Sequence, residues 1–214
     1  MQGLPQTMKI GVFGGTFDPI HIGHLIAAGC CCEQLSLDMV LFMPASIAPH
    51  KQGCRLTSAH HRVQMLILAT HENQRFTVST YEINKSGVSF TVESLIHLCK
   101  QYPNDQLLLL LGPDMISDLP NWHEPEKILD LATPVAMLRT GIDDREKIFS
   151  NDRLMQLFGT KQLEMTKKSA VQLPAVSVRS TAIRDAMASG KSIQDYVPQA
   201  VEDYIYAHQL YRIT

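Results

Sequence analysis

The stretch Lys9-Ile10-Gly11-Val12-Phe13-Gly14-Gly15-Thr16-Phe17-Asp18-Pro19-Ile20-His21-Ile22-Gly23-His24 decides the fold of this chain. Its apolar run 10–13 has the length of a buried strand and ends at two glycines, and a helical pattern begins near Gly23. A strand, a glycine turn and a helix in this order let the backbone approach a phosphate closely and point free helix amides at its charge. We therefore predict a nucleotide site here.

Two histidines stand at the predicted start of that helix. His21 and His24 are three positions apart, so they lie on one helical face and can reach the same bound group. No serine or cysteine is placed for a catalytic triad, so acyl transfer is poorly supported. We interpret the pair as hydrogen-bond donors that steady a phosphoryl group as charge builds on it. The alternative is that both are ordinary surface or core residues.

Length and composition predict one domain. The chain has 214 residues, of which 45% are hydrophobic, enough for a full core over 8–214, with a small helical part from about 176 to 214. Residues 1–7 are expected to be a disordered leader. The formal net charge of -2 gives no global attraction to nucleic acid or to an acidic membrane. The aliphatic run 107–111 is too short to cross a bilayer, so we expect a cytoplasmic protein; a homo-oligomer stays open.

Five cysteines occur at positions 30, 31, 32, 54 and 99. The three consecutive ones point about 100° apart on a helix and cannot converge on one metal ion, and no Cys-x-x-Cys pair exists. We expect free thiols in a reducing compartment, and no structural metal at His50 or at the pair 60–61.

Strand and helix patterns alternate along the whole chain. Strands are predicted at 39–43, 76–79, 106–111, 134–138 and 176–178, with short extended pieces at 162–165 and 171–173. Helices are predicted at 24–35, 59–70, 91–99 with Thr91 as its cap, 115–119, 125–131 and 143–158 and from near 181 and 198, and 81–87 is read as a loop or short hairpin. This alternation predicts an α/β fold with a doubly wound parallel sheet, in which ligands bind at the carboxyl ends of the strands.

The segment from Gly14 to His24 resembles the signature of the nucleotidylyltransferases, and specifically of the bacterial nicotinate mononucleotide adenylyltransferases. The resemblance continues over nearly the whole chain, through Ala48-Pro49-His50-Lys51, Ser89-Phe90-Thr91, Leu111-Gly112-Pro113-Asp114, Trp122 and Ser180-Thr181-Ala182-Ile183-Arg184. It implies a Rossmann-like fold and transfer of the adenylyl group of ATP to nicotinate mononucleotide. It also implies magnesium (Mg²⁺) carried by the triphosphate rather than by a metal site of the protein.

The resemblance also implies a role for individual residues. The implied catalytic residues are His21, His24, Lys51 and Arg184. The residues implied to hold ATP and its phosphates are Gly14, Gly15, Thr16, Phe17, Gly112, Asp114, Arg179, Ser180 and Thr181. The residues implied to select nicotinate are Phe90, Thr91, Trp122 and His123.

Each role has a structural alternative. Arg184 is a cation in the first turn of a predicted helix, where the helix dipole disfavours it, and this favours an anion ligand. Capping alone would explain Ser180, and Asp114 either accepts from ribose hydroxyls or caps the helix at 115–119. Lys51 alone reads as a solvated loop lysine. Trp122 has polar neighbours, which argues against burial on all sides.

Three departures from the family pattern concern single contacts: Arg179 stands where serine is usual, Phe90 where tyrosine is usual and Pro113 where alanine is usual. The rival functions are adenylyl transfer to nicotinamide mononucleotide or phosphopantetheine, cytidylyl transfer, and a non-catalytic nucleotide sensor. Residues 21–24 also match the signature of class I aminoacyl-tRNA synthetases, but the chain is too short for that machinery and has no basic tRNA face.

Overall fold

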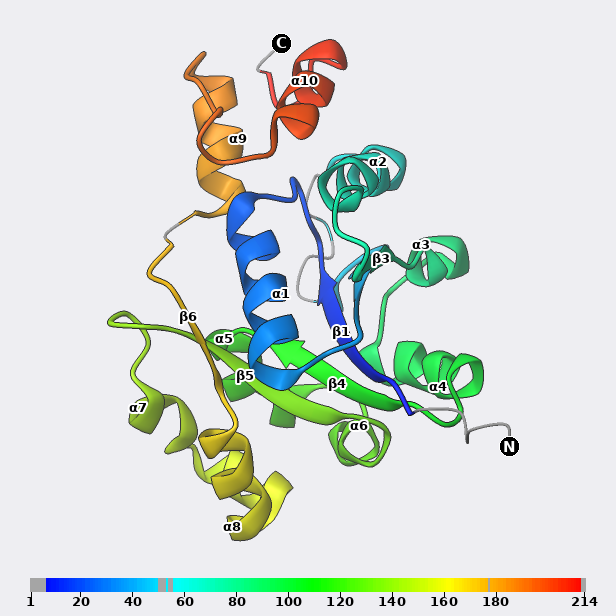
Figure 1. The fold of residues 1–214 in the computed structure, drawn as a ribbon, viewed down its shortest axis with the longest axis vertical. Coiled ribbons are helices and arrows are strands. Elements are labelled where there is room, and N and C mark those ends of the chain that lie inside the picture. The colour runs from blue at the N-terminus through cyan, green and yellow to red at the C-terminus, as the bar shows by residue number, and fades with distance from the viewer. Residues whose placement is uncertain (1–6, 50–52, 54–55, 177, 213–214) are drawn as a thin grey trace, which may run out of the picture.

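The computed structural model describes residues 7–49, 53, 56–176 and 178–212. In this part of the chain, six parallel strands form one sheet in the order β3-β2-β1-β4-β5-β6 (Figure 1). The strands are β1 (Lys9–Gly15), β2 (Met39–Pro44), β3 (Phe76–Val78), β4 (Gln106–Leu111), β5 (Thr133–Arg139) and β6 (Val171–Leu173). The order reverses between β1 and β4, and this switch point is where doubly wound sheets bind ligands. The predicted fold is confirmed.

Helices cover both faces of the sheet. They are α1 (Ile22–Leu35), α2 (Ala59–Thr70), α3 (Tyr81–Lys85), α4 (Thr91–Gln101), α5 (Pro113–Asp118), α6 (Pro125–Leu131), α7 (Arg145–Phe149), α8 (Asp152–Lys168), α9 (Ser180–Ala188) and α10 (Gln199–Ala207), with a 3-10 turn at Leu119–Asn121. Along β4, Leu108 and Leu110 belong to the core under α1 and α2, whereas Leu109 belongs to the core under α4, α5, α6 and α8. A strand covered on both faces needs apolar residues at every position, which explains its uninterrupted aliphatic run.

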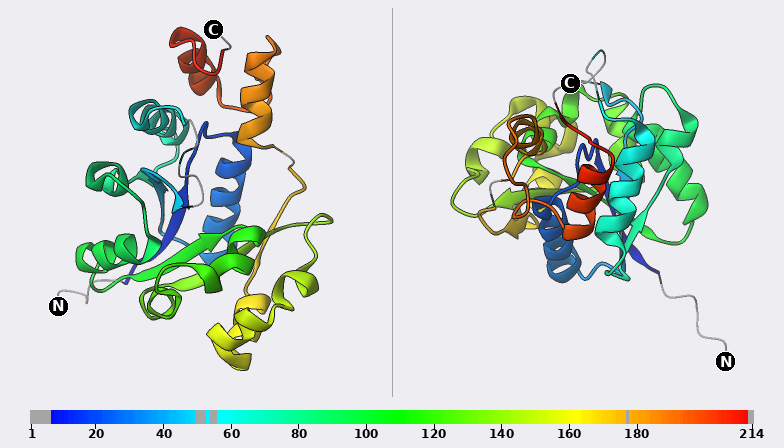
Figure 2. Two further views of the ribbon diagram at one scale, coloured as in Figure 1. Left: turned by 180° about the vertical axis from the view of Figure 1, so that it is seen from behind. Right: turned by 90° about the horizontal axis from the view of Figure 1, so that it is seen from above.

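The two C-terminal helices lie above the carboxyl end of β1 rather than against the middle of either face (Figures 1 and 2). Ile183 and Ile205 insert from α9 and α10 into the core that α1 and α2 share. The backbone N–H of Ile22, the first residue of α1, donates to the carbonyl of Tyr196 at 2.9 Å. This arrangement places the C-terminal part of the chain directly over the signature loop.

Two local predictions around the second half of the sheet are wrong. The segment 143–158 is not one helix, because the Asn151 side chain accepts from the N–H of Arg153 at 2.9 Å and starts α8 as a separate helix. The piece 162–165 is not extended, since α8 continues through a kink at Gly159, whose φ of 69° suits glycine. Buried Leu163 holds this second half of α8 on the core.

Two further predictions are corrected. The segment 81–87 contains the short helix α3, which buries Glu82 and ends at Ser86 with a φ of 60°. No strand is assigned at residues 176 and 178, whereas residue 177 lies outside the described residues. The last strand ends at Leu173, just before Pro174, whose nitrogen has no hydrogen to donate.

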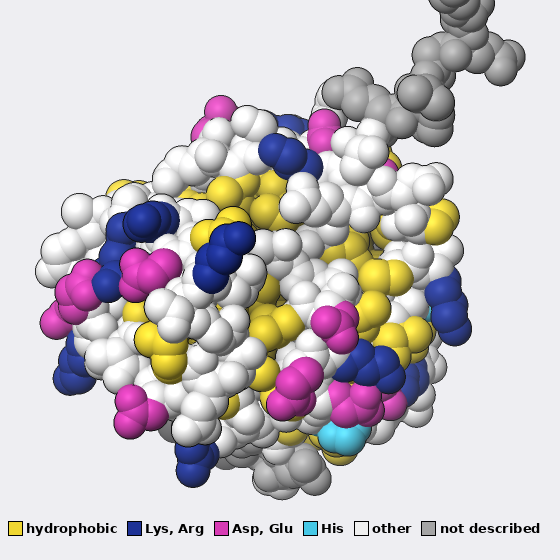
Figure 3. Space-filling model, turned by 90° about the horizontal axis from the view of Figure 1, so that it is seen from below, with side chains coloured by type: hydrophobic (Ala, Val, Ile, Leu, Met, Phe, Trp, Pro, Cys, Tyr) yellow, Lys and Arg dark blue, Asp and Glu magenta, His cyan; other side chains and the backbone are white. Residues whose placement is uncertain are grey.

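Acidic and basic side chains are interspersed on the face seen from below (Figure 3), in keeping with the small net charge. Among the helices of the described residues, none combines the length and the apolarity that a bilayer crossing demands. Most of the predicted leader at 1–7 lies outside the described residues.

Candidate functional site

The glycines of the signature complete β1 instead of turning away from it. Gly14 and Gly15 pair with Met43 and Pro44 at the end of β2. A Cβ on Gly15 would stand 2.9 Å from the ring of Phe17, so a side chain does not fit there. That ring is 2% exposed and packs 5.1 Å from the His24 ring, centroid to centroid. The side chain of Phe17 therefore supports His24, and only its backbone can meet a phosphate.

The two signature histidines form a stacked pair at the start of α1. Their ring centroids are 3.7 Å apart and their planes meet at 22°. The backbone N–H of His21, the N-cap residue, donates to Nδ1 of His24 at 3.3 Å. Because Nδ1 accepts this hydrogen, a neutral His24 carries its proton on Nε2. The fold thus leaves Nε2 as the donor atom of a neutral His24, and its predicted contact with a phosphoryl group stays a prediction.

His21 is the more buried member of the pair, with 5% of its surface exposed. Burial lowers the pKa of His21 to about 4, against an ordinary value of 6.5. Its Nδ1 is buried and has no hydrogen-bond partner within the described part of the chain. His21 is therefore a neutral imidazole at physiological pH, and its predicted contact with a phosphate would be a hydrogen bond and not a charge pair.

The C-terminal motif lies on the signature loop. The hydroxyl of Ser180 donates to the carbonyl of Pro19 at 2.9 Å. Arg184 donates from Nη1 to the carbonyl of Asp18 at 2.7 Å and from Nη2 to the Thr181 hydroxyl at 3.2 Å. The capping interpretation of Ser180 is wrong, because Arg179 is the N-cap residue of α9 and its side chain makes no capping bond. The predicted convergence of the two motifs is what the structure shows.

Asp18 connects the signature loop to distant parts of the chain, and the sequence did not reveal these contacts. Its carboxylate is buried, accepting from the Tyr211 hydroxyl at 2.7 Å and from the N–H of Thr57 at 3.1 Å. Tyr211 follows α10 and is 193 positions away in the chain, so no local pattern could have found it. The signature loop is held from both sides, by α9 through its carbonyls and by Tyr211 through this carboxylate.

Arg62 of α2 lies beneath the same loop and was also missed. Its side chain is 2% exposed, and its guanidinium donates to four backbone carbonyls, those of Thr16 and Ala45 at 2.8 Å, of Thr57 at 3.1 Å and of Ser46 at 3.3 Å. Burial lowers the pKa of Arg62, although the charge of Asp18 opposes this effect. A cation among the apolar positions of α2 was the available signal. Arg62 ties the carboxyl ends of β1 and β2 together.

Two hollows flank the end of β1. The smaller, of about 120 Å³, is lined by His21 and His24 together with Arg139 at the carboxyl end of β5. Arg139 donates from Nε and Nη2 to Asp143 at 3.0 and 2.8 Å. Sequence reasoning missed Arg139, although a cation directly after a buried strand is a recognisable signal. This hollow therefore brings a cation into the surroundings of the histidine pair.

The larger cavity, of about 740 Å³, lies on the other side of β1. All four predicted nicotinate residues line it: Phe90, Thr91, Trp122 and His123. The rings of Phe90 and His123 are 4.8 Å apart, and Trp122 is half-buried, as its polar neighbours predicted. Gly14, Gly15 and Thr16 also line this cavity, whereas His21 and His24 line only the smaller hollow.

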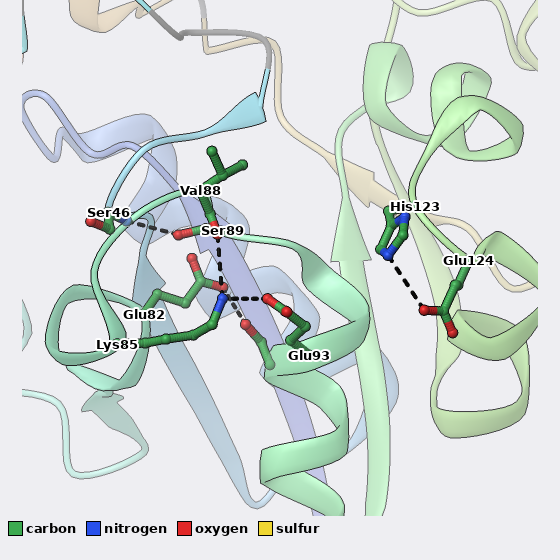
Figure 4. A network of polar contacts seen from close by, with 9 residues as sticks. Ser46, Glu82, Lys85, Val88, Ser89, Glu93, His123 and Glu124 are labelled. Atoms are coloured by element: carbon green, nitrogen blue, oxygen red, sulfur yellow. Dashed lines mark hydrogen bonds and ion pairs between the residues drawn. The ribbon is translucent and has the colours of Figure 1, made fainter.

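The charges around the larger cavity are acidic. Glu82, Asp114 and Asp118 line it, and none of its described lining residues is a lysine or an arginine. Glu82 is 8% exposed, and burial raises its pKa, whereas hydrogen bonds from the hydroxyls of Ser94 and Ser89 lower it. Figure 4 shows Glu82 and Ser89 on this wall, opposite His123. An anionic ligand must therefore be met here mainly by hydrogen-bond donors.

Two capping predictions are wrong. Thr91 is the first helical residue of α4, and the N-cap residue is Phe90. Asp114 is the second residue of α5, after Pro113, and Gly112 is the N-cap residue. Asp114 lies with Trp122 in the larger cavity, and its predicted contact with ATP stays a prediction. Lys51 and His50 lie outside the described residues.

The described cysteines, at 30, 31, 32 and 99, are free thiols. Burial raises the pKa of Cys31 to about 12, so this thiol is unreactive. Over the described ranges, no group of three or more histidine, cysteine or carboxylate side chains could hold a metal ion.

Known proteins are similar to this chain in sequence and in fold. The Cytidylyltransferase-like family matches residues 12–186. A protein of Thermomicrobium roseum named "probable nicotinate-nucleotide adenylyltransferase" is 40% identical over 95% of this chain and 92% of its own length. A protein of Thermus thermophilus with the same name is 40% identical over 96% of this chain and 100% of its own. Plasmodium falciparum nicotinic acid mononucleotide adenylyltransferase, solved in complex with NaAD, has a TM-score of 0.72 at 20% identity, covering 95% of this chain and 97% of its own.

Proposed function

The chain belongs to the Cytidylyltransferase-like family and, within it, to the nicotinate-nucleotide adenylyltransferases, and from this premise we propose what it does. It transfers the adenylyl group of ATP to nicotinate mononucleotide, giving nicotinate adenine dinucleotide and pyrophosphate, a step of NAD biosynthesis. The observation that carries the proposal is the cavity that brings Phe90, Thr91 and Trp122 to the glycine end of β1, next to the histidine pair.

Each of the two hollows binds part of a different substrate. The pyridine ring of the mononucleotide occupies the larger cavity beside Trp122, whose face stacks on it. Its phosphate lies at Gly14 and Gly15, where the backbone comes close without side chains. The triphosphate of ATP lies on the other side, at the histidine pair and below α9. One phosphate oxygen of the mononucleotide attacks the α-phosphorus of ATP, and the bond to the β-phosphate breaks as pyrophosphate leaves.

The protein stabilises charge and aligns the two anions, so no covalent intermediate is required. His24 donates from Nε2 to the phosphoryl group being transferred, and neutral His21 stacks against it. Arg184, Ser180, Thr181 and Arg179 meet the leaving pyrophosphate at the start of α9. We assign Lys51 to the triphosphate as a further positive charge. Magnesium bound to the triphosphate neutralises part of its charge.

Pyrophosphate release with three acceptors tests the proposal. Purified protein receives ATP and Mg²⁺ with nicotinate mononucleotide, nicotinamide mononucleotide or phosphopantetheine in separate reactions. We expect pyrophosphate mainly with the first acceptor, because the helix start at Thr91 favours an anionic ring substituent. Equal turnover of the two pyridine substrates would contradict the selection assigned to Thr91 and Trp122, and turnover of phosphopantetheine alone would replace the proposed substrate.

The variant His24→Ala tests the chemistry in the same assay. Loss of a donor to developing charge typically lowers kcat by about 100-fold or more, with the fold intact. His71→Ala, an exposed histidine at the end of α2, is the matched control and should keep full activity. Circular dichroism establishes that both variants are folded. A fully active His24→Ala would remove this side chain from the mechanism.

A further inference from the structure

The buried carboxyl of Glu82 lines the cavity assigned to the pyridine ring, yet neither the signature nor the predicted site includes it. The hydroxyl of Ser94, in the first part of α4, donates to Oε1 of Glu82 at 2.6 Å. The Ser89 hydroxyl lies near the same carboxyl and lowers its pKa. Glu82 therefore has a hydroxyl on each side of Phe90 and Thr91 in the sequence, and that of Ser94 donates to it.

Ser89 extends this connection to the end of β2. Its Oγ accepts from the backbone N–H of Ser46 at 2.9 Å (Figure 4). The backbone N–H of Ser89 donates in turn to the carbonyl of Ile47 at 3.0 Å. Glu82 thus stands where α3, the start of α4 and the segment after β2 meet. Ala45 and Ala48 of that segment line the same cavity.

The start of α4 depends on this contact. Its N-cap residue, Phe90, offers no side-chain oxygen, and no side-chain capping bond is made there. The nearby Lys85 does not hold the start of α4 through Glu82. It pairs with Glu93 at the surface and donates to the carbonyl of Val88. Among the described residues, Glu82 therefore supplies the side-chain acceptor that Ser94 of α4 uses.

We propose that Glu82 is a positioning residue for the pyridine half of the cavity: it holds Ser89 and Ser94 so that Phe90 and Thr91 face Trp122. Glu82 does not touch the reacting atoms. Because Glu82 lines the cavity of Phe90, Thr91 and Trp122 and not the hollow of the histidine pair, it governs the affinity for the pyridine mononucleotide and leaves the affinity for ATP unchanged. This inference rests on the proposed function, which supplies the ligand of the cavity.

Trp122 provides a direct measurement. It is the one tryptophan of the chain and lines the same cavity, so its fluorescence reports the binding of nicotinate mononucleotide without ATP or turnover. Glu82→Ala should raise the Kd for nicotinate mononucleotide about tenfold, as expected when the Ser94 hydroxyl loses its acceptor and the carboxyl beside Ser89 is removed. In steady state, the KM for this substrate should rise in parallel while the KM for ATP stays within about twofold. Glu82→Gln keeps an acceptor oxygen and should restore most of the affinity.

Ser89→Ala tests the same connection without touching the carboxyl. It should reproduce the loss in Glu82→Ala, and the double variant should lose less than the product of the two single effects, because both remove one contact. Glu93→Gln is the control: this carboxylate lies in the first turn of α4, pairs with Lys85 and does not line the cavity. It should bind nicotinate mononucleotide like the wild type.

Three results would overturn the inference: unchanged binding in both Glu82→Ala and Ser89→Ala, an equal rise of both KM values, or independent effects in the double variant. If Glu82→Ala does not fold, Ser89→Ala and Glu82→Gln decide alone. The proposed function fails in a different way, since the wild-type protein itself would then neither bind nicotinate mononucleotide nor turn it over.

Discussion

Some residues around the carboxyl end of β1 lie in environments that are unusual for their type. Arg62 is a cation with almost no contact with water, and it is stabilised by four carbonyl oxygens instead of by a carboxylate. Carbonyls at strand ends have no partner in the sheet, and leaving them buried without a donor is costly. One guanidinium, with its five N–H groups, meets this need at a single point.

Arg62→Met should therefore destabilise the protein strongly. Methionine fills a similar volume but leaves four acceptors without a donor, and each buried unsatisfied group costs about 1–3 kcal/mol. We expect a loss of at least about 3 kcal/mol in the free energy of unfolding, measured by urea denaturation. The control Arg75→Met removes an exposed pair with Glu33 and should cost less than about 1 kcal/mol. Equal losses in the two variants would contradict the role of Arg62.

His21 makes stability depend on pH. Its pKa is about 4 in the folded protein and about 6.5 in the unfolded chain, so the unfolded state binds the extra proton first as pH falls. The stability that neutral His21 allows is complete above pH 6.5. It decreases as pH falls from 6.5 to about 4, and this decrease levels off below that range.

Comparing wild type with His21→Gln isolates this effect. The free energy of unfolding of the wild type should fall more steeply between pH 6.5 and 4, by an amount on the order of 3 kcal/mol over the window. Glutamine cannot titrate, so its curve should be flatter there. Urea denaturation at a series of pH values gives both slopes, and parallel curves would show that His21 is not buried as a neutral ring.

At the scale of elements, the C-terminal helices act as a clamp on the signature loop. They are fixed to the body of the protein elsewhere: α10 packs on α2, where Nδ1 of His61 and the hydroxyl of Tyr204 lie 2.9 Å apart. From this base, Tyr211 reaches Asp18 and Arg184 reaches the carbonyl of the same residue. The loop that carries the histidines takes its shape from helices that come at the far end of the sequence.

Tyr211→Phe removes one arm of this clamp. The hydroxyl donates to a charged group, so its loss should cost about 1.5–3 kcal/mol of stability. It should also raise the KM for ATP more than the KM for nicotinate mononucleotide, because Asp18 adjoins the histidine side of β1. Tyr206→Phe, on the exposed face of α10, should change neither quantity. A Tyr211→Phe protein with wild-type stability and unchanged KM values would show that α9 alone holds the loop.

At the scale of the whole molecule, the switch point of the sheet provides two compartments that share one strand end. The larger cavity is lined by the glycine end of β1 and the smaller hollow by the histidine pair, and the two share no lining residue among those described. Two anions can thus approach one point from two directions, each held by its own set of donors. The larger cavity has an acidic lining and the net charge of the chain is small and negative. The anionic substrates must therefore be attracted by individual hydrogen-bond donors and not by the overall charge of the protein.

Removal of divalent metal should affect turnover and not folding. Since no group of metal ligands is present within the described ranges, we expect EDTA to leave Tm within about 2 °C of the untreated protein. The same treatment should abolish pyrophosphate release, and excess Mg²⁺ should restore it, because the ion travels with the triphosphate. A large fall in Tm with EDTA would reveal a structural metal bound by the protein.

The sequence by itself determined the features that short-range patterns carry. Continuous apolar runs predicted strands covered on both faces, and the strand-glycine-helix order predicted where a nucleotide would bind. The spacing of His21 and His24 put them on one helix turn, where they stack. Each of these depends on neighbours within a few positions, so the linear order of residues contains the information.

Only the tertiary structure decided what lies beneath and around that site. The partners of Asp18, Arg62 and Glu82 come from other elements, up to 193 positions away, and nothing in the local sequence marks them as partners. The same holds for capping at α4 and α9, where residues one position from the predicted cap took the role because packing set the helix starts. Burial and hydrogen-bond satisfaction are properties of the assembled core. They decided the partners of the buried polar groups and the N-cap residues, whereas the local patterns decided which segments form helices and strands.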